Sequence, residues 1–469
     1  MAATTTTRPI SGARTQAGPV RLLVIGAGSR GSHAYGQWCL EHPDRARVVA
    51  VADPNEERRD SLARQHDVAT AGRFRSWREA LAEPGAWDAV VIATPDRLHV
   101  DPAVRALELG SDVLLEKPIA PTVQGLNRLV EAARLHPGAV TVAHVLRYTP
   151  FFTAVKRALD EGRVGALQGI QHTENIGYWH FAHSYVRGNW NRSDTSSPML
   201  LAKACHDLDI IRWLVGARCA QVSSFGGLRH FRAEVAPAGS TERCIDGCAV
   251  ADSCPYNAER FYVEELADVH GPPVTALTLD TSPEGRRRAL RGTDYGRCVY
   301  RMNNDVVDHQ TTSLRYADGV TTSLVVSAFT AHNTRTLTVM GSHGQLIGDM
   351  RDGRVTITDF GRAPAQLSGQ VTAPVESEVL ELAGTDVSED VSEAFAGHGG
   401  GDAALMAAFT DRVQSRRGGS PTAAALTSLE ESIDSHLVAF AAEQARLTGS
   451  VVDLATFADE HGLRLRSGA

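Results

Sequence analysis

Residues 20–147 alternate short apolar runs with helix-like segments, and this alternation restricts the possible fold more than any other feature of the chain. The apolar runs are RLLVIGAG, RVVAVADP, WDAVVIATP, SDVLLEKP and AVTVAHVLR, and helical stretches such as NEERRDSLARQH and HVDPAVRALELG separate them. Strands that alternate with helices form a parallel sheet with right-handed crossovers. The sequence therefore predicts an α/β fold whose first domain, residues 20–147, is built on a parallel sheet.

The remaining residues, 148–469, have a different pattern. Long β-rich runs cover residues 308–330, with a hairpin signal at Asp318-Gly319, and residues 334–360. Successive strand–turn–strand pairs indicate a mostly antiparallel sheet, so we expect a second domain of the α+β class. The segments outside this pattern are a disordered tail (1–19), an insertion (229–297), an acid-rich loop (374–396) and two closing helices (402–417 and 424–447).

Composition and charge exclude several classes of protein. Of the 469 residues, 43% are hydrophobic and 22% are charged, which is ordinary for a soluble globular protein. The formal net charge of −8 leaves no basic excess for a nucleic acid, and no stretch approaches the roughly 18 consecutive apolar residues of a membrane span. Residues 1–19 lack the apolar core of a secretory signal, and the seven cysteines do not resemble a secreted disulfide framework. We therefore expect a cytoplasmic protein.

The segment GAGSRG (26–31) has the G-x-G-x-x-G spacing and stands between an apolar strand and a plausible helix. There Gly26 permits a tight turn, Gly28 lets the backbone approach a pyrophosphate, and Gly31 lets helix and strand pack closely. Asp53 ends the next strand, where an acid binds the adenosine ribose hydroxyls. Together these features predict a dinucleotide site, whereas the glycine pattern alone could also be a structural turn.

Asp53 also bears on the choice of cofactor. A carboxylate at this position repels the additional phosphate of NADP, so NAD is the expected dinucleotide. Arg58 and Arg59 lie close enough in the sequence to weaken this preference, and NADP is therefore the less favoured alternative.

Several segments together resemble the glucose–fructose oxidoreductase / inositol dehydrogenase / MocA (Gfo/Idh/MocA) family. They are GAGSRG, ATPDRLHV (93–100), LLEKPIA (114–120), GRVGALQGI (162–170), CHDLDIIRWL (205–214) and HGGGD (398–402). The segments follow the order of the family and extend over nearly the whole chain. The resemblance implies a Rossmann domain, then an α+β domain with an open, mostly antiparallel sheet that often forms homodimers or homotetramers.

The activity that the resemblance implies is NAD(P)-dependent oxidation or reduction of a hydroxyl of a sugar, glycoside or cyclitol. The loop Ala93-Thr94-Pro95 … His99 resembles the loop of the family that faces the cofactor. The expected cofactor-binding residues are Gly26, Gly28, Ser29, Arg30, Gly31, Asp53, Thr94, Pro95, His99, Glu116 and Lys117.

Lysine is rare in this chain: of 47 lysine and arginine residues, only Lys117, Lys156 and Lys203 are lysines. A lysine amine can be tuned towards neutrality, which an arginine cannot, so a retained lysine is a candidate for chemistry. Lys117 follows a predicted strand in the segment Glu116-Lys117-Pro118, at the carboxyl edge of the sheet where α/β folds bind ligands. We expect it to stabilise a substrate alkoxide, as the family lysine does; otherwise it is a surface lysine on a loop.

The segment PMLLAKACHDLDIIRWL (198–214) has helical periodicity and carries His206 beside Lys203. Many sugar dehydrogenases that it resembles have an aspartate four residues before this histidine, where this chain has Ala202. Lys203 is the natural replacement for that aspartate. We expect Lys203 and His206 to be an acid/base pair, either of which takes the hydroxyl proton, while the alternative for each is a structural role.

Residues 175–191 are dense in aromatic side chains, histidine and arginine, a mixture that suits a carbohydrate pocket. The same residues could form an ordinary amphipathic element with a buried aromatic side. The expected substrate contacts are Tyr178, His180 and Arg187 from this segment, Arg147 at the domain junction and His398 before three glycines.

Three cysteines, Cys244, Cys248 and Cys254, are close together in the predicted insertion, and Cys298 follows after a long loop. Such a group in a cytosolic protein is more typical of a metal than of a disulfide, and four thiolates would form a closed structural zinc site. Free thiols, a disulfide and an iron–sulfur centre remain as alternatives, because the spacing is not that of a C-x-x-C knuckle.

These features support one main hypothesis, an NAD-dependent dehydrogenase that acts on a sugar or glycoside hydroxyl. An alternative within the same family is a redox-neutral glycosidase, which oxidises a sugar transiently, eliminates, adds water and reduces the product again. A third hypothesis, a binding or sensory protein on a degenerate dehydrogenase fold, is disfavoured by the intact GAGSRG motif, Asp53 and Lys117.

Overall fold

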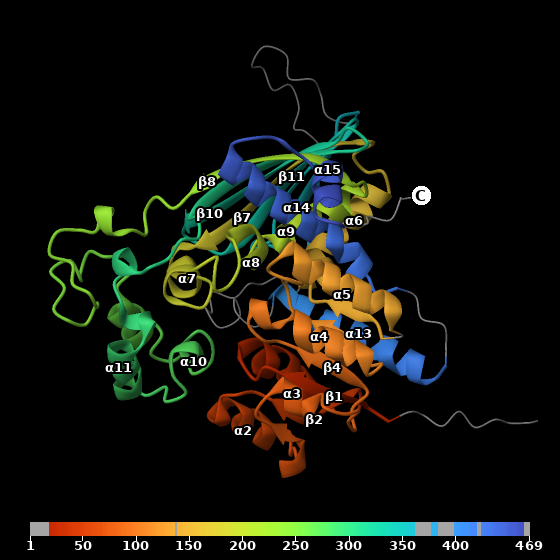
Figure 1. Cartoon of the computed structure of the whole chain (residues 1–469). Coiled ribbons are helices and arrows are strands. Elements are labelled where there is room, and N and C mark those ends of the chain that lie inside the picture. Colours follow the sequence, from red (N-terminus) through yellow and green to blue (C-terminus); the bar gives the residue numbers. More distant parts are fainter. Residues whose placement is uncertain (1–17, 137, 362–376, 383–397, 420–423, 464–469) are drawn as a thin grey trace, which may run out of the picture.

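Two β-sheets organise the chain, each with its own helices, in a computed structural model that describes residues 18–136, 138–361, 377–382, 398–419 and 424–463 (Figure 1). Most of the expected tail and of the expected acid-rich loop lie outside these residues. No helix within the described ranges is long and apolar enough to cross a membrane.

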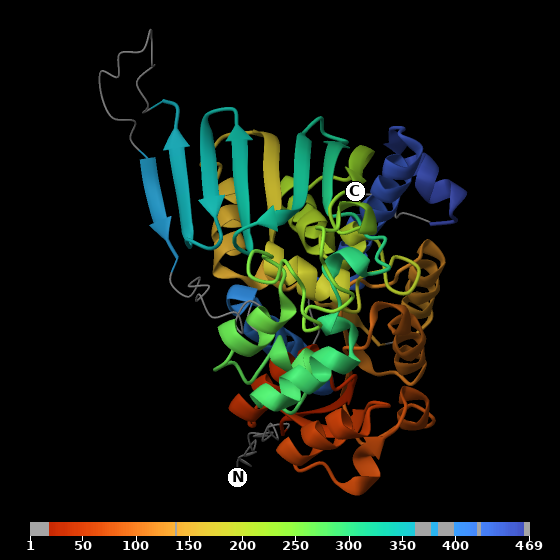
Figure 2. The ribbon, with the colours of Figure 1, turned by 90° about the vertical axis from the view of Figure 1, so that its left-hand side faces the viewer.

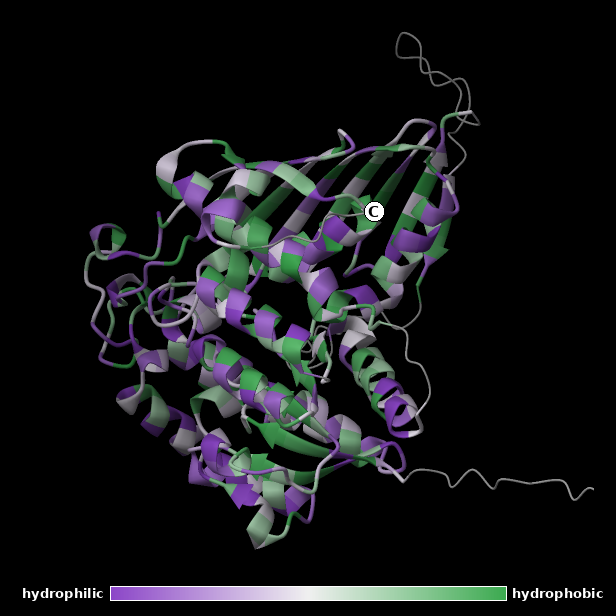
Figure 3. Ribbon diagram, turned by 45° about the vertical axis from the view of Figure 1, so that its right-hand side comes forward, coloured by the Kyte–Doolittle hydropathy of each residue, from purple (hydrophilic) through white to green (hydrophobic). Residues whose placement is uncertain are grey.

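The first sheet has six strands in the order β3-β2-β1-β4-β5-β6, and every pairing is parallel. Its strands are β1 (Val20–Ile25), β2 (Ala46–Ala52), β3 (Arg73–Phe74), β4 (Ala89–Ile92), β5 (Asp112–Leu115) and β6 (Val140–Val142). These strands read as continuous apolar runs because helices cover both faces of the sheet. The helices are η1 (Arg30–Gly36), α1 (Gln37–Glu41), α2 (Glu56–Gln65), α3 (Trp77–Ala80), α4 (Val100–Glu108) and α5 (Val123–Leu135). Figure 3 shows the hydrophobic strands between helices of mixed hydropathy.

The second sheet has nine strands in the order β14-β13-β12-β11-β7-β10-β9-β8-β15, and only β7 and β10 pair in parallel. Its strands are β7 (Leu167–Gly177), β8 (Cys219–Gly227), β9 (His309–Tyr316), β10 (Thr321–Thr330), β11 (Thr334–Gly341), β12 (Gly344–Asp349), β13 (Arg354–Asp359), β14 (Ser377–Glu381) and β15 (Val452–Asp453). The predicted fold class, a parallel sheet followed by an open, mostly antiparallel one, is confirmed.

Buried and exposed residues alternate along this second sheet, so one face is a core and the other is open. The covering helices are α6 (Pro150–Asp160), α9 (Cys205–Val215), α14 (Leu429–Thr448) and α15 (Leu454–Glu460). They pack against the inner face through buried residues such as Phe151, Ile210 and Leu437. Figure 2 shows the opposite face with no helix over its strands.

The predicted insertion falls between β8 and β9, where irregular segments and short helices replace the sheet. Its helices include η7 (Arg260–Glu265), α10 (Val274–Leu277) and α11 (Pro283–Gly292). A small core of its own, with Tyr262, Val274 and Leu290 fully buried, holds these helices together. The insertion lies beside the short helix α7 (Tyr178–Phe181) and away from most strands of the second sheet (Figure 1).

The division of the chain at residue 147 separates the strands of the two sheets, but a helix from beyond this residue packs on the first sheet. Helix α13 (Gly401–Arg417) comes from the far end of the chain and buries Leu405 and Phe409 against β1 of the first sheet. It therefore serves as a layer of the first domain.

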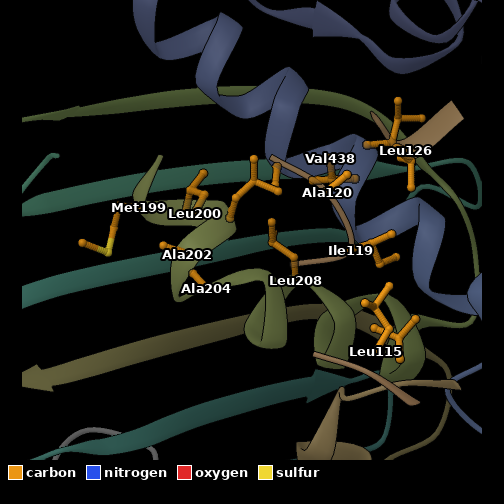
Figure 4. Packing of buried hydrophobic residues seen from close by; sticks show 14 of the residues in the cluster. Leu115, Ile119, Ala120, Leu126, Met199, Leu200, Ala202, Ala204, Leu208 and Val438 are labelled. Atoms are coloured by element: carbon orange, nitrogen blue, oxygen red, sulfur yellow. The ribbon is translucent and has the colours of Figure 1, made fainter. Parts of the chain in front are cut away.

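An apolar cluster also joins the two domains at the end of β5 (Figure 4). Ile119 and Ala120 of the loop after this strand pack among Leu200 and Ala202 of α8 (Met199–Ala202) and Val438 of α14. This packing fixes the loop that carries Lys117 against the second domain.

Candidate active site

The glycine-rich loop after β1 has the shape that a dinucleotide requires. Gly26 has φ +97°, and a Cβ there would lie 2.5 Å from the carbonyl oxygen of Ala93. A Cβ on Gly31 would lie 1.9 Å from the oxygen of Gly26, so close packing of loop and helix excludes any side chain. A Cβ on Gly28 would meet nothing within 4 Å, which leaves this backbone open to a phosphate. The loop therefore fits the pyrophosphate of a dinucleotide.

Asp53 directly follows β2 and is tied to this loop. Its Oδ2 accepts a hydrogen bond from the Ala27 amide at 2.7 Å, and its Oδ1 accepts one from the Asn55 amide at 2.8 Å. Carboxylate oxygens have further lone pairs for ribose hydroxyls. Arg59 is buried and donates to the Asp53 carbonyl at 3.3 Å, while Arg58 is exposed. The carboxylate thus stands where the sequence analysis expects a ribose acceptor.

The loop after β4 is held from within by His99. The two ring nitrogens of His99 lie 2.7 Å from the Thr94 carbonyl and 2.6 Å from the Pro118 carbonyl, and the residue is buried. Thr94 itself donates to the Leu98 carbonyl at 3.0 Å. His99 therefore links the loops after β4 and β5 rather than facing the site, which makes it a positioning residue; Pro95 lies on the same loop.

Arg30 joins three motifs that are remote in the sequence. Its guanidinium donates to Glu116 Oε1 at 2.5 Å and to both carboxylate oxygens of Asp402, and Ser29 immediately precedes it. Glu116 Oε1 also accepts from the Tyr35 hydroxyl at 2.5 Å. Burial acts to raise the pKa values of Glu116 and Asp402, but the charge of Arg30, other nearby positive groups and hydrogen bonds together outweigh it, and both pKa values are lowered. Two carboxylates therefore neutralise Arg30, so it braces the glycine loop rather than offering a charge to phosphate.

Lys117 reaches across the domain boundary. Its Nζ donates a hydrogen bond of 2.7 Å to the carbonyl oxygen of Ala202. The backbone beyond it is fixed by His436, whose Nε2 accepts from the Ile119 amide at 2.8 Å. An ammonium has three donors, so the bond to Ala202 leaves capacity for a substrate oxygen.

Lys203 pairs with a carboxylate that the sequence analysis did not single out. Its Nζ lies 3.4 Å from Oε1 of Glu174 on β7, in a buried environment. Burial lowers the pKa of Lys203 most strongly, and the charge of Arg335 adds to this, whereas Glu174 acts to raise it. The net shift is downward, which favours the neutral amine that a base needs.

A buried ion network continues behind this pair. Arg335 on β11 stands opposite Glu174 in the sheet register and pairs with it and, at 2.8 Å, with Asp207 of α9. Asp207 also accepts from His172 Nε2 at 2.8 Å. Burial acts to raise the pKa of Asp207, but Arg335 and His172 hold it well below its usual range. Arg335 thus lies between the carboxylates of Glu174 and Asp207, and Glu174 connects this network to Lys203.

His206 lies in the same buried region. Burial lowers its pKa well below the usual value, and the charges of Lys117 and of neighbouring histidines lower it further, so its ring is neutral near pH 7. Its ring centroid lies 5.8 Å from that of His398, whose Nδ1 lies 2.9 Å from Asp402 Oδ2. The pKa of His180 is also lowered, first by burial and then by the charge of Lys203. Its Nδ1 lies 3.0 Å from Asn333 Oδ1. The structure therefore gathers Lys117, Lys203, His206, His180 and His398 around one site.

Two of the predicted substrate contacts are buried, and protein groups accept from their guanidinium donors. Arg147 is 2% exposed and donates twice to Asp209 at 2.7 Å and once to the Leu426 carbonyl, so its donors are used inside the protein. Arg187 is 4% exposed and donates to backbone carbonyls of the insertion. Both are structural because a buried guanidinium must have its hydrogen bonds satisfied. Tyr178 is half-buried, with its ring 6.2 Å from that of Tyr256.

Glu174, Asp207, Arg335 and Asp402 are the site residues that the sequence analysis missed. A signal for Glu174 exists in the strand pattern: His172 and Glu174 alternate with less buried neighbours on β7, which places two polar side chains on the core face. Buried polar residues on such a face need partners from other elements. Those partners come from distant segments, and the sequence has no local signal for them.

Cys205 and two histidines form a buried group with possible ligand atoms within 4.8 Å of one another. The group is not built for a metal ion. Both nitrogens of His436 lie at backbone partners, the Ile119 amide and the Ser432 carbonyl, and His144 Nδ1 lies 2.8 Å from Asp209. Burial also raises the pKa of the Cys205 thiol to about 12, so it stays protonated.

The fold and the site together define a class: an oxidoreductase that holds a dinucleotide in its first domain and presents polar side chains of the second domain to it. The chain belongs to the Gfo/Idh/MocA oxidoreductase family. The description "Oxidoreductase family, NAD-binding Rossmann fold" matches residues 20–144, and "Oxidoreductase family, C-terminal alpha/beta domain" matches residues 156–454. The resemblance seen in the sequence is thereby confirmed.

Curated relatives cover different shares of the chain. YteT of Bacillus subtilis is 26% identical over 68% of this chain and 71% of its own length. The inositol 2-dehydrogenase of Corynebacterium glutamicum is 28% identical over 43% of this chain, and that match spans 56% of the relative's length. The 2,7-anhydro-N-acetylneuraminate hydratase of Mediterraneibacter gnavus is 27% identical over 40% of this chain and 48% of its own length.

Solved structures show the same architecture. A levoglucosan dehydrogenase in complex with NADH and levoglucosan superposes with a TM-score of 0.65, covering 93% of this chain and 99% of that one. The identity of 17% restricts this similarity to the fold.

Proposed function

We propose that this protein is an NAD-dependent dehydrogenase that oxidises a hydroxyl group of a sugar, glycoside or cyclitol. One observation carries the proposal: Lys117, at the end of β5, lies close to Lys203 and His206 of the second domain. Two of the three lysines of the chain are thus found at this site. The polar environment of His180 and His398 beside these residues suits a polyhydroxylated substrate.

Each of these side chains has a chemical task in such a reaction. NAD, when bound to the glycine loop, supplies the acceptor for the hydride that leaves the carbinol carbon. Lys117 donates to the substrate oxygen and stabilises the negative charge that develops there. Lys203 or His206, whose pKa values are both lowered first of all by burial, takes the hydroxyl proton, so the alcohol loses a hydride and a proton and becomes a carbonyl.

We propose NAD rather than NADP as the cofactor. The Asp53 carboxylate would repel a ribose phosphate, and Arg59, which could have compensated, is buried against the Asp53 backbone. A cytoplasmic location, which the sequence analysis expects, agrees with a cofactor of central metabolism.

The test is the absorbance of NADH during incubation of the purified protein with NAD or NADP and a panel of sugars, cyclitols and glycosides. We expect steady accumulation of NADH with one substrate class, and a kcat/KM at least about tenfold lower with NADP, which corresponds to about 1.4 kcal/mol. Absence of turnover with every substrate, or a preference for NADP, would contradict this proposal.

A redox-neutral, NAD-retaining reaction is the second candidate, and two observations favour it. Ala202 removes the carboxylate that many sugar dehydrogenases of the family have, and one relative is a hydratase. In the same assay this reaction releases an aglycone or an altered sugar without net NADH. The two candidates are therefore distinguished by one experiment.

We also propose that the open face of the second sheet pairs two copies of the chain. Large apolar side chains are exposed on it, among them Val325, Phe329 and Ile347 on β10 and β12. Large apolar side chains exposed together on a sheet face that also has many threonine and serine side chains favour an interface. Size-exclusion chromatography with light scattering should give a dimer or tetramer, and Val325→Arg should shift it towards the monomer. A monomeric wild-type protein would refute the proposal.

A further inference from the structure

Four thiols surround one small cavity in the insertion between β8 and β9. Cys244, Cys248, Cys254 and Cys298 all line this cavity, whose volume is about 20 Å³, and all four are free thiols. A space of this size holds about one water-sized sphere. It suits a single ion rather than a multinuclear cluster.

The backbone places two of these cysteines side by side. The Cys244 amide donates to the Gly296 carbonyl at 3.0 Å, and the Cys298 amide donates to the Glu242 carbonyl at 2.9 Å. The two segments thus pair like antiparallel strands, although more than fifty residues separate them in the sequence. Gly247, with φ +74°, makes the turn that leads into Cys248.

Hydrogen-bond donors surround the sulfur atoms. Three of the sulfurs accept a hydrogen bond from the backbone amide two residues further along the chain. Cys248 accepts from Val250, Cys254 from Tyr256 and Cys298 from Tyr300. Two cations are also near: Arg187 Nη2 lies 3.5 Å from Cys244 Sγ, and the charge of Arg301 acts on Cys248. Hydrogen bonds of this kind orient side chains that act as metal ligands.

We propose that Cys244, Cys248, Cys254 and Cys298 bind one zinc ion in a closed, tetrahedral site, and that this ion braces the wall of the substrate pocket. Four thiolates are the ligand set of a structural zinc site without an open position. Among the described residues, no three of the four sulfurs lie within 4.8 Å of one another.

The connection to the pocket runs through Arg187. This residue ends helix η5 (Ala182–Arg187), which directly continues α7 with its Tyr178 and His180. Its Nε donates to the Arg297 carbonyl and its Nη2 to the Tyr256 carbonyl, both at 2.8 Å. These carbonyls belong to the segments of Cys298 and Cys254, so the ion fixes the anchor of the helix that carries His180. This second part rests on the proposed function.

The first experiment measures metal by inductively coupled plasma mass spectrometry in the full-length protein purified from zinc-supplemented cells. We expect about one zinc per chain, and substantial loss of zinc in Cys254→Ser and Cys298→Ser. Cys219→Ser is the matched control, because Cys219 is a free thiol on β8 outside the insertion, and it should retain the metal. This measurement needs no turnover, so it stands even if the dehydrogenase proposal fails.

A second measurement on the wild-type chain covers the case in which the serine variants do not fold. Zinc is removed with a chelator and replaced by cobalt, and thiolate-to-metal charge-transfer absorption is expected for tetrahedral sulfur ligands. Wild-type protein without zinc, iron with cluster absorbance, or a mass that indicates disulfides would each overturn the zinc site.

The effect on the pocket is tested separately by comparing zinc-loaded and zinc-free wild-type protein. We expect KM for the substrate to rise on the order of tenfold to a hundredfold without zinc, while the affinity for NAD stays within a factor of about two. Restored KM on adding zinc supports the bracing role. An unchanged KM in metal-free protein would refute that role and leave the zinc site itself standing.

Discussion

Replacing Lys117 with methionine should lower kcat by about 10²–10³-fold, or roughly 3–4 kcal/mol of barrier, while NAD still binds. The substitution keeps most of the apolar stem but removes the ammonium, which in the wild type donates to the Ala202 carbonyl at 2.7 Å. The developing negative charge on the substrate oxygen then lacks its donor. Steady-state kinetics with the identified substrate, together with NAD titration by fluorescence, would measure both quantities.

The chain offers a matched control for this change. Lys156 lies on α6, away from the site, and pairs with Asp160 at 2.5 Å in an i,i+4 ion pair. Lys156→Met makes the same chemical change and should leave kcat unaltered, because exposed pairs of this kind contribute little. Comparable rates in Lys117→Met and Lys156→Met would refute the catalytic role of Lys117.

Replacing Lys203 with arginine should lower kcat/KM by about 10²–10⁴-fold and abolish the rise of activity with pH. Arginine keeps the positive charge beside Glu174, so the ion network with Arg335 survives, but it cannot be deprotonated. The pH profile of kcat/KM separates this effect from simple misfolding. A variant that still rises with pH at the wild-type position would assign the proton to His206 instead.

Replacing Glu174 with glutamine should shift the pH profile, because Glu174 affects the pKa of Lys203. Glu174 acts to raise the pKa of Lys203 against the stronger effect of burial, so removing its charge lowers that pKa further. In Glu174→Gln the amine is neutral at lower pH, and the rising limb of the profile should move in the acid direction. A limb that moves in the alkaline direction would contradict the assignment of Lys203 as the base.

The parts of the site that could be predicted are those with a local pattern. The glycine loop, Asp53 and Lys117 each stand at the end of an apolar strand, and parallel strands bring their carboxyl ends to one edge. His206 and Lys203 could be predicted because a helical period and a rare residue coincide there. The two sheets follow equally from period and turn signals.

The parts that could not be predicted depend on contacts between distant segments. Arg147 and Arg187 are residues of a type that often binds hydroxyl groups of a substrate. The fold instead surrounds them with an acid and with carbonyl groups that only the tertiary structure supplies. The partnership of Glu174 with Lys203 likewise joins a strand and a helix junction. In each case burial decides the role, and burial of a charged side chain cannot be read from its neighbours in the sequence.

Helix α13 has a consequence for how this protein comes into being. Its residues Leu405 and Phe409 cover β1, but they are synthesised only after strands β7–β14 of the second sheet. During translation, part of one apolar face of the first sheet therefore stays uncovered until helix α13 has emerged. The first domain therefore completes its packing only when most of the second domain has been synthesised, and a nascent chain of this kind is a natural client for a chaperone.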